Sequence, residues 1–359
     1  MGLGIDPHRL DVLLRRVALE VEHGPLPSAQ LAVARHGELA AFETWGASPG
    51  RYLLQSVGRT IVASAIWKLI GDGKIDIARP VSEYIPEFAA NSKESVTIEQ
   101  VLTHTAGFPF APLGYPKMAD RALRLAAFAK WRLDYPPGGR LQFHLTSAAW
   151  LIAELVERVT GRSLPDYLRT SIAEPLGLGF ALGVSPAEQA GTVAPMVCTD
   201  GDGAEVDPWG PWYLNNPDIV AAGEPAHAVV ASAADVALHY QALLHSDLWA
   251  PGTVAEAIRP HVTAVPAGDQ LYGGATRPVS VGLFVLVAGP DPGMGLPTVG
   301  SPRTFGHGGA AYQTAFCDPD SGVSFALLSN GYPASGYDYS RRGQAMLLNI
   351  ANLAADLVD

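Results

Sequence analysis

A single serine stands between an extended apolar pair and a long apolar segment, and this order constrains the fold more than any other feature. Leu53 and Leu54 lie just before Ser56, and residues 61–70 are apolar enough for a buried helix. The pattern predicts Ser56 at a helix N-terminus, with Arg59 three positions later on the same helix face. Amides and the positive dipole end at such a position favour an anionic oxygen, so Ser56 is a candidate nucleophile. The alternative is an N-cap serine with a solvated arginine one turn on.

The composition excludes several classes of protein. The chain has 359 residues, 48% of them hydrophobic and 16% charged, which suffices for one large domain or two closely packed ones. A net charge of −11 argues against nucleic acid or an anionic membrane as partner and is compatible with a small-molecule substrate. We expect a small-molecule substrate and a protein that is a monomer or homodimer. The N-terminus lacks the apolar core of a signal peptide, which predicts a cytoplasmic protein. Cys198 and Cys317 are expected to be free thiols.

Hydrophobic periodicity predicts a helix at each end of the chain and strands between. The first helix covers residues 6–22, and the last carries Met346, Ile350, Leu353 and Leu357 at helical spacing. An N-terminal hairpin is expected from residues 31–35 and 39–43, joined by a tight turn. Further strands are expected at 279–287, 303–307, 312–318 and 323–328.

Three segments that follow Ser56 in order carry a family resemblance. They are Lys68 to Ile77, Pro80 to Phe88 and Val101 to Pro109. The series resembles the serine β-lactamase-like superfamily, in its class C β-lactamase and family VIII carboxylesterase branch, over about residues 25 to 332. The resemblance implies an α+β fold: an antiparallel sheet flanked by helices, plus an inserted all-helical domain. Residues 1–75 and 230–359 would form the sheet domain and 76–229 the helical domain and active-site loops, with the cleft between them.

Two motifs of the family are altered in this chain. The family's Ser-x-x-Lys ends here in Arg59, and arginine, whose pKa lies above about 12, cannot take the proton of Ser56. Arg59 could instead supply positive charge to an oxyanion. The family's Tyr-x-Asn falls on His144 and Thr146, with Phe143 as the other possible match to the tyrosine. We interpret His144 as the general base; the alternative is a histidine that only hydrogen-bonds in a polar cleft.

The third motif of the family is intact in its esterase-like form. The motif predicts a strand that faces Ser56. The imidazole of His307 on this strand is expected to reach an oxygen of the bound acyl group. By resemblance, the oxyanion hole consists of the amide of Ser56 and an amide near Ala310 or Ala311. The residues assigned to this motif and the pocket beside it are His307, Gly308, Gly309, Ala310 and Tyr312.

Two other segments carry candidate substrate-binding residues. His227 stands where relatives have Pro-Ala-Gly-Gly, and its alternative is a surface histidine. Trp209 and Trp212 either wall a pocket or belong to a packed surface loop. The histidines near the expected cleft do not have the spacing of metal ligands, so we expect neither a metal nor a cofactor.

These residues predict an acyl-transfer enzyme, an esterase-like hydrolase or acyltransferase, that acts on a small ester, thioester, lactone or amide through Ser56. A role in specialised metabolism would fit. One alternative is an isomerase, lyase or cyclase that uses Arg59, His144 and His307 for acid-base chemistry. Another is a non-catalytic ligand-binding homologue. Efficient β-lactamase activity is not expected, because the family's lysine and tyrosine are both absent.

Overall fold

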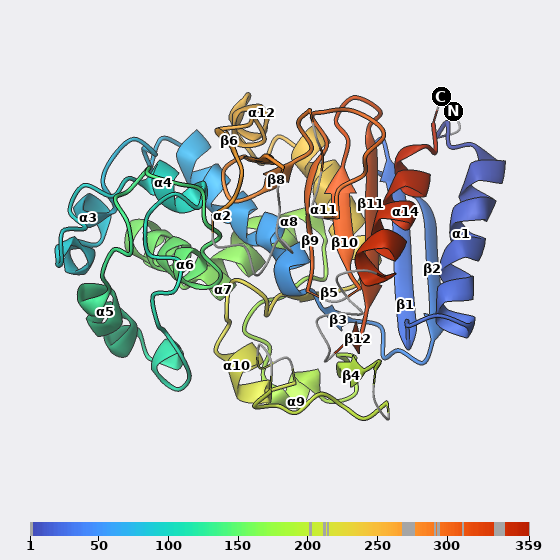
Figure 1. Cartoon of the computed structure of the whole chain (residues 1–359), viewed down its shortest axis with the longest axis horizontal. Coiled ribbons are helices and arrows are strands. Elements are labelled where there is room, and N and C mark those ends of the chain that lie inside the picture. The colour runs from blue at the N-terminus through green and yellow to red at the C-terminus, as the bar shows by residue number, and fades with distance from the viewer. Residues whose placement is uncertain are drawn as a thin grey trace.

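A broad sheet with helices on both faces forms one half of the molecule, and a group of helices forms the other (Figure 1). The computed structural model describes residues 3–200, 203–210, 213, 215–267, 277–290, 292, 295–310, 312–333 and 342–358. The two ends of the chain lie together beside the sheet (Figure 1), where the amide of Asp6 donates to the carbonyl of Leu357 at 2.9 Å. This arrangement confirms the expected antiparallel sheet flanked by helices.

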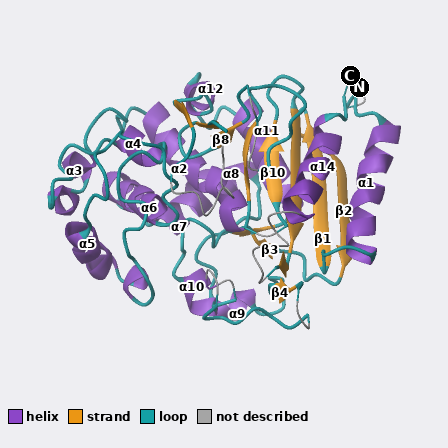
Figure 2. Ribbon diagram, viewed as in Figure 1, coloured by secondary structure: helices purple, strands orange, loops and turns teal. Residues whose placement is uncertain are grey.

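Within the described residues, eight strands form one antiparallel sheet, in the order β2-β1-β11-β10-β9-β8-β7-β6 (Figure 2). β1 (Ser28–Arg35) and β2 (Glu38–Gly46) form the expected hairpin. Its turn consists of His36 and Gly37, whose φ angles of 55° and 83° match the left-handed turn that joins twisted strands tightly. The expected strand at 279–287 is broken into two short strands by residues 282–285.

Alternation along β1 divides the core into two apolar clusters. Leu31 and Val33 point to the face covered by α1 (Pro7–Glu22) and α14 (Gln344–Ala355), whereas Ala32 and Ala34 point to the opposite face. On that opposite face α11 (Ala233–His245) packs against β1, β10 and β11. Small side chains in β1 therefore let α11 approach the sheet closely.

The helix α2 (Arg59–Gly71) belongs to the cores of both halves of the molecule. It contacts α6 (Ser147–Thr160) and α7 (Leu164–Leu168) in the helical group, and also β9 (Phe305–Gly308) of the sheet. Every residue from Arg59 to Trp67 is buried. A helix that is apolar all round must lie inside the protein, and α2 accordingly fixes its N-terminal end at the junction between the two halves (Figure 1).

The remaining elements are mostly short. The other helices are α3 (Val81–Tyr84), α4 (Ile98–Leu102), α5 (Arg121–Lys130), α8 (Glu174–Leu176), α9 (Pro186–Gln189), α10 (Pro217–Ala221) and α12 (Thr253–Ala257). The 3₁₀ helices are η1 (Gln55–Gly58), η2 (Pro86–Ala89) and η3 (Lys117–Ala119), and η4 (Arg169–Ala173) is a π-helical turn. The other strands are β3 (Tyr52–Leu53), β4 (Val197–Cys198), β5 (Val230–Ala231), β6 (Val262–Ala264), β7 (Val279–Val281), β8 (Leu286–Val287), β10 (Thr314–Cys317), β11 (Val323–Ser329) and β12 (Gly331–Tyr332).

The structure also bears on the cysteines and on the length of the helices. Cys198 and Cys317 are free thiols, as predicted. Among the described residues, no helix has both the length and the apolar character needed to cross a membrane.

Candidate active site

Ser56 lies in the 3₁₀ turn η1, directly before α2. The N-cap of α2 is Gly58, and no side chain caps that helix end. Ser56 is therefore not an N-cap serine, and its carbonyl instead accepts the amide of Arg59. The residue before it, Gln55, has φ of 50°, a left-handed conformation that costs a non-glycine residue about 1–2 kcal/mol. Such strain in the residue before a half-buried serine is typical of functional turns.

Segments from two distant parts of the chain hold this turn in place. The short strands β3 and β5 pair, and their hydrogen bonds continue into the turn, from the amide of Leu54 to the carbonyl of Val229 at 2.8 Å. The next bond runs from the amide of Gln55 to the carbonyl of His227 at 3.1 Å. On the other side Gln313 Nε2 donates to the carbonyl of Leu53 at 2.9 Å. The conformation around Ser56 thus depends on contacts made long after it in the sequence.

Arg59 points into the interior rather than to solvent. The residue is 1% exposed, and its guanidinium donates to the carbonyl of Leu145. It also lies over the rings of Phe143 and Phe284, at 4.6 Å and 5.1 Å from their centroids. Cation–π contacts of this kind stabilise a desolvated guanidinium by about 1–2 kcal/mol each. The alternative of a solvated arginine is therefore wrong, and a permanent positive charge lies beside the site.

The structure contradicts the interpretation of His144 as the general base. Its Nδ1 lies 2.7 Å from the carbonyl of Gln142, and its Nε2 accepts the amide of Phe108 at 3.1 Å. Both ring nitrogens are thus engaged by the backbone, and burial lowers the pKa of His144 to about 4. The neighbouring Phe143 instead faces Arg59, with its ring centroid 5.8 Å from that of His307. Of the two candidate matches to the family's tyrosine, Phe143 is therefore the one that faces Arg59, and its ring has no proton to exchange.

His307 lies on β9, which packs against η1, and is buried. Its Nδ1 lies 2.6 Å from the carbonyl of Gly308, so Nδ1 carries the proton and Nε2 presents a lone pair. Burial and then the charge of Arg59 lower the pKa of His307 to about 3. A neutral ring of this tautomer accepts hydrogen bonds at Nε2 and does not donate them, which disfavours its expected role as a donor to the oxyanion.

His227 is paired with a carboxylate that sequence reasoning missed. Its Nδ1 lies 2.8 Å from Glu224 Oε2, and its side chain is 13% exposed. Glu224 stands three residues earlier, and the Glu-x-x-His spacing is the signal that could have revealed the pair. The alternative of a surface histidine is wrong, because His227 is largely enclosed and hydrogen-bonded next to the Ser56 turn.

The other predicted site residues fall into two groups. Gly308 ends β9, and Gly309 lies so near the turn that a Cβ on it would stand 3.4 Å from the carbonyl of Leu54. Ala310 follows and is half-buried, whereas Thr146 lies at the N-terminal end of α6. Tyr312, in contrast, packs in the cluster beneath α1 and α14. Its expected place in the pocket is therefore not supported.

The aromatic loop is only partly described. Trp209 is 63% exposed and contacts the rings of Tyr115 and Tyr213, with centroids 6.0 Å and 6.4 Å away. Trp212 and Ala311 lie outside the described residues. In the part of the chain that the structure describes, no three His, Cys, Asp or Glu side chains are grouped so that they could hold a metal ion.

Comparisons with known proteins find relatives that match most of the chain. The chain is 29% identical to esterase EstB of Burkholderia gladioli over 350 residues, 85% of this chain and 86% of that protein. It is 24% identical over 381 residues to a putative D-alanyl-D-alanine carboxypeptidase of Escherichia coli K12, covering 91% of this chain and 83% of that protein. A crystal structure of a family VIII carboxylesterase shares the fold, with a TM-score of 0.79, 22% identity and coverage of 97% and 98%. The family model described as Beta-lactamase matches residues 15–349, nearly the whole chain, and we conclude that the chain belongs to this family.

Proposed function

We propose that this protein catalyses acyl transfer from a small-molecule ester, thioester, lactone or amide through a covalent intermediate on Ser56. Ser56 Oγ attacks the carbonyl carbon, the leaving group departs, and an acceptor then releases the acyl group from the serine. The esterase named among the relatives supports this class of reaction. The half-buried position of Ser56 in a strained turn supports its role as the nucleophile.

One observation carries the proposal: buried polar atoms without a protein partner gather around this turn. Five such side-chain atoms, each lacking a hydrogen-bond partner among the described residues, belong to residues on the turn or on the segments that hold it. They are Gln55 Oε1, Glu224 Oε1, His227 Nε2, His307 Nε2 and Gln313 Oε1. More than about 90% of buried polar groups in proteins are paired. Their concentration around one serine supports a site whose hydrogen bonds are completed by a substrate.

The charges at the site favour the development of negative charge during the reaction. Arg59 places a buried guanidinium beside the strand that faces Ser56, and no proton transfer is required of it. The amides of Ser56 and Ala310 are the proposed donors to the oxyanion. Because His307 Nε2 is an acceptor, we propose that it binds a donor group of the substrate next to the scissile bond.

The proposal is tested by intact mass after exposure to a fluorophosphonate and, separately, to a p-nitrophenyl acyl ester. A single adduct is expected on the wild type and none on Ser56→Ala. Ser92→Ala, which alters an exposed serine, is the control and should be modified like the wild type. A folded wild-type protein that stays unmodified by both reagents would refute the covalent mechanism.

The acceptor is part of the proposal. Water as the acceptor gives a hydrolase, and an alcohol or amine gives an acyltransferase of the kind that specialised metabolism uses. The partition of the acyl group between water and an added acceptor distinguishes the two functions. With a p-nitrophenyl ester as donor, added methanol or hydroxylamine should divert the acyl group from the free acid to the ester or hydroxamate. Product analysis that finds only the free acid at high acceptor concentration would restrict the function to hydrolysis.

A further inference from the structure

The proposed function requires a group that accepts the proton of Ser56, and most side chains around the turn are unsuited to this step. Arg59 remains protonated, and Phe143 has no exchangeable proton. His144 has both ring nitrogens engaged by the backbone. His307 has an open Nε2, but its other nitrogen faces a carbonyl, and burial together with the charge of Arg59 opposes protonation of the ring.

The backbone of His227 is bound to the turn that carries Ser56. The strands β3 and β5 pair antiparallel, and their hydrogen bonds continue beyond the end of β3 and the start of β5. There the amide of Gln55 donates to the carbonyl of His227 at 3.1 Å. The fit of the two segments is tight, because a Cβ on Gly58 would stand 2.8 Å from Val229 Cβ. His227 is therefore fixed beside Ser56 by the ladder itself, although it is 171 positions away in the sequence.

The ring of His227 is oriented by a buried carboxylate. Glu224 is 1% exposed, and its Oε2 lies 2.8 Å from His227 Nδ1. The same oxygen accepts the amides of Ala226 and His227, both at 2.9 Å, so the carboxylate cannot rotate freely. With Nδ1 facing a carboxylate, the proton of the neutral ring stays on Nδ1 and the lone pair on Nε2. That Nε2 is buried and has no hydrogen-bond partner among the described residues.

We infer that His227 is the general base of this enzyme and Glu224 the positioning residue that holds it, so that Ser56, His227 and Glu224 form a catalytic triad. His227 Nε2 takes the proton of Ser56 Oγ as Oγ bonds to the acyl carbon, and the carbonyl electron pair moves to the oxygen. Collapse of this tetrahedral intermediate expels the leaving group, which takes the proton from Nε2. The acceptor then repeats the sequence, and Ser56 Oγ leaves with the returned proton. This assignment rests on the proposed function and replaces the missing lysine and tyrosine of the family motifs.

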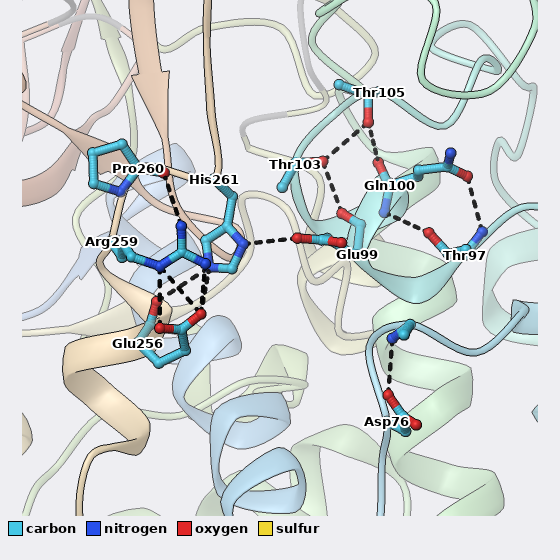
Figure 3. A network of polar contacts seen from close by, with 11 residues as sticks. Asp76, Thr97, Glu99, Gln100, Thr103, Thr105, Glu256, Arg259, Pro260 and His261 are labelled. Carbon is cyan, nitrogen blue, oxygen red and sulfur yellow. Dashed lines mark hydrogen bonds and ion pairs between the residues drawn. The ribbon is translucent and has the colours of Figure 1, made fainter.

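The chain contains a second histidine–glutamate pair that serves as a matched control (Figure 3). His261 Nδ1 lies 2.8 Å from Glu99 Oε1, the same separation as in the His227 pair. Its Nε2, however, lies 3.1 Å from the carbonyl of Glu256, so both ring nitrogens are engaged by protein oxygens. His261 has no lone pair directed at a substrate and is expected to be purely structural.

The experiment measures fluorophosphonate labelling rates of Ser56, and kcat/KM for a p-nitrophenyl ester across pH, in matched variants. We expect His227→Ala and His227→Gln to lower both rates about 10²–10⁴-fold, the range that general-base catalysis contributes, and His261→Gln to leave them unchanged. Added imidazole should restore part of the activity of His227→Ala. Glu224→Gln should lower kcat/KM and move the acid limb of its pH profile to lower pH, and Glu224→Asp should recover part of the loss.

The outcomes separate this inference from the proposed function. If the wild type is labelled on Ser56 and folded His227 variants are labelled at the wild-type rate, the triad is overturned while the nucleophile stands. If the wild type is not labelled at all, the proposed function fails and the triad fails with it. Loss of activity in Glu224→Gln with the acid limb of the pH profile at its wild-type position would reduce Glu224 to a structural residue.

Discussion

The substitution Gln313→Leu tests whether the position of Ser56 depends on a single buried amide. Gln313 is fully buried, and its Nε2 donates to the carbonyl of Leu53 at 2.9 Å and to that of Ser329 at 2.8 Å. It thereby ties the segment before Ser56 to the end of β11. Leucine has a similar size but cannot donate, so the two carbonyls lose their partner while the packing is largely kept.

The magnitude follows from these contacts. Each buried carbonyl left without a partner costs about 1–3 kcal/mol, hence about 4 kcal/mol for the two. Gln313 Oε1 is itself buried without a partner among the described residues, and removing it returns about 2 kcal/mol. The net loss is about 2 kcal/mol. For 359 residues, at about 2.1 cal/mol/K of unfolding entropy per residue, this lowers Tm by about 3 °C.

The assay compares this variant with Gln241→Leu. Gln241 is equally buried, and its Nε2 donates to Ala34, Gly322 and Ser324, away from the Ser56 turn. Gln241→Leu should therefore cost at least as much stability but keep kcat/KM at temperatures well below Tm. Gln313→Leu should lose activity about tenfold or more at the same temperature, because a shift of about 1 Å at a catalytic group has large effects on rate. Equal kcat/KM in the two variants would show that Gln313 does not position Ser56.

Three further predictions concern the strand and the charges at the site. Gly306→Ala is expected to abolish folded protein, because its Cβ would stand 2.2 Å from the carbonyl oxygen of Ala315, whereas Gly114→Ala, which meets nothing within 4 Å, should express and melt normally. Since burial and Arg59 lower the pKa of His307 to about 3, from an ordinary 6.5, the unfolded chain binds a proton between these pH values that the folded chain does not. The part of the unfolding free energy that comes from keeping His307 neutral is therefore fully present above pH 6.5 and is lost as the pH falls toward 3. The fall in Tm from about pH 7 to about pH 4 should accordingly be smaller in His307→Gln than in the wild type. Arg59→Met should raise the pKa of His307 in an NMR titration and slow acylation; an unchanged titration would mean that the Arg59 charge does not act on this ring.

Local patterns were sufficient for most of the fold. The helix at 6–22, the hairpin turn at His36 and Gly37 and the apolar α2 each follow from periodicity or turn chemistry within one segment, and the structure confirms them. Patterns within one segment were not sufficient at 279–287, where an apolar run predicts one strand. The structure instead has two strands that pair antiparallel, because residues 282–285 turn the chain back. Phe284 has φ of 65° in this turn, and the amide of Gly282 donates to the carbonyl of Val285 at 2.9 Å.

The site shows the same limit more sharply. Counting along the motif could not decide between Phe143 and His144, because neighbouring residues in an irregular segment point in different directions. The choice is made by Arg59, whose guanidinium lies against the Phe143 ring, and by Phe108, whose amide engages His144. The Glu-x-x-His spacing places Glu224 near His227 in the chain, but it does not show that the carboxylate is buried and bonded to the ring.

What the sequence by itself determined was the order of the elements, the family to which they belong and the serine on which the site is built. All of these depend on residues close together in the chain, where hydrophobic spacing and turn chemistry act. The tertiary structure alone decided that Arg59 is buried, that His144 is engaged by the backbone and that the carboxylate-bound His227 lies beside the Ser56 turn. These features depend on backbone hydrogen bonds and desolvation between segments as many as 171 positions apart, and no local pattern encodes them.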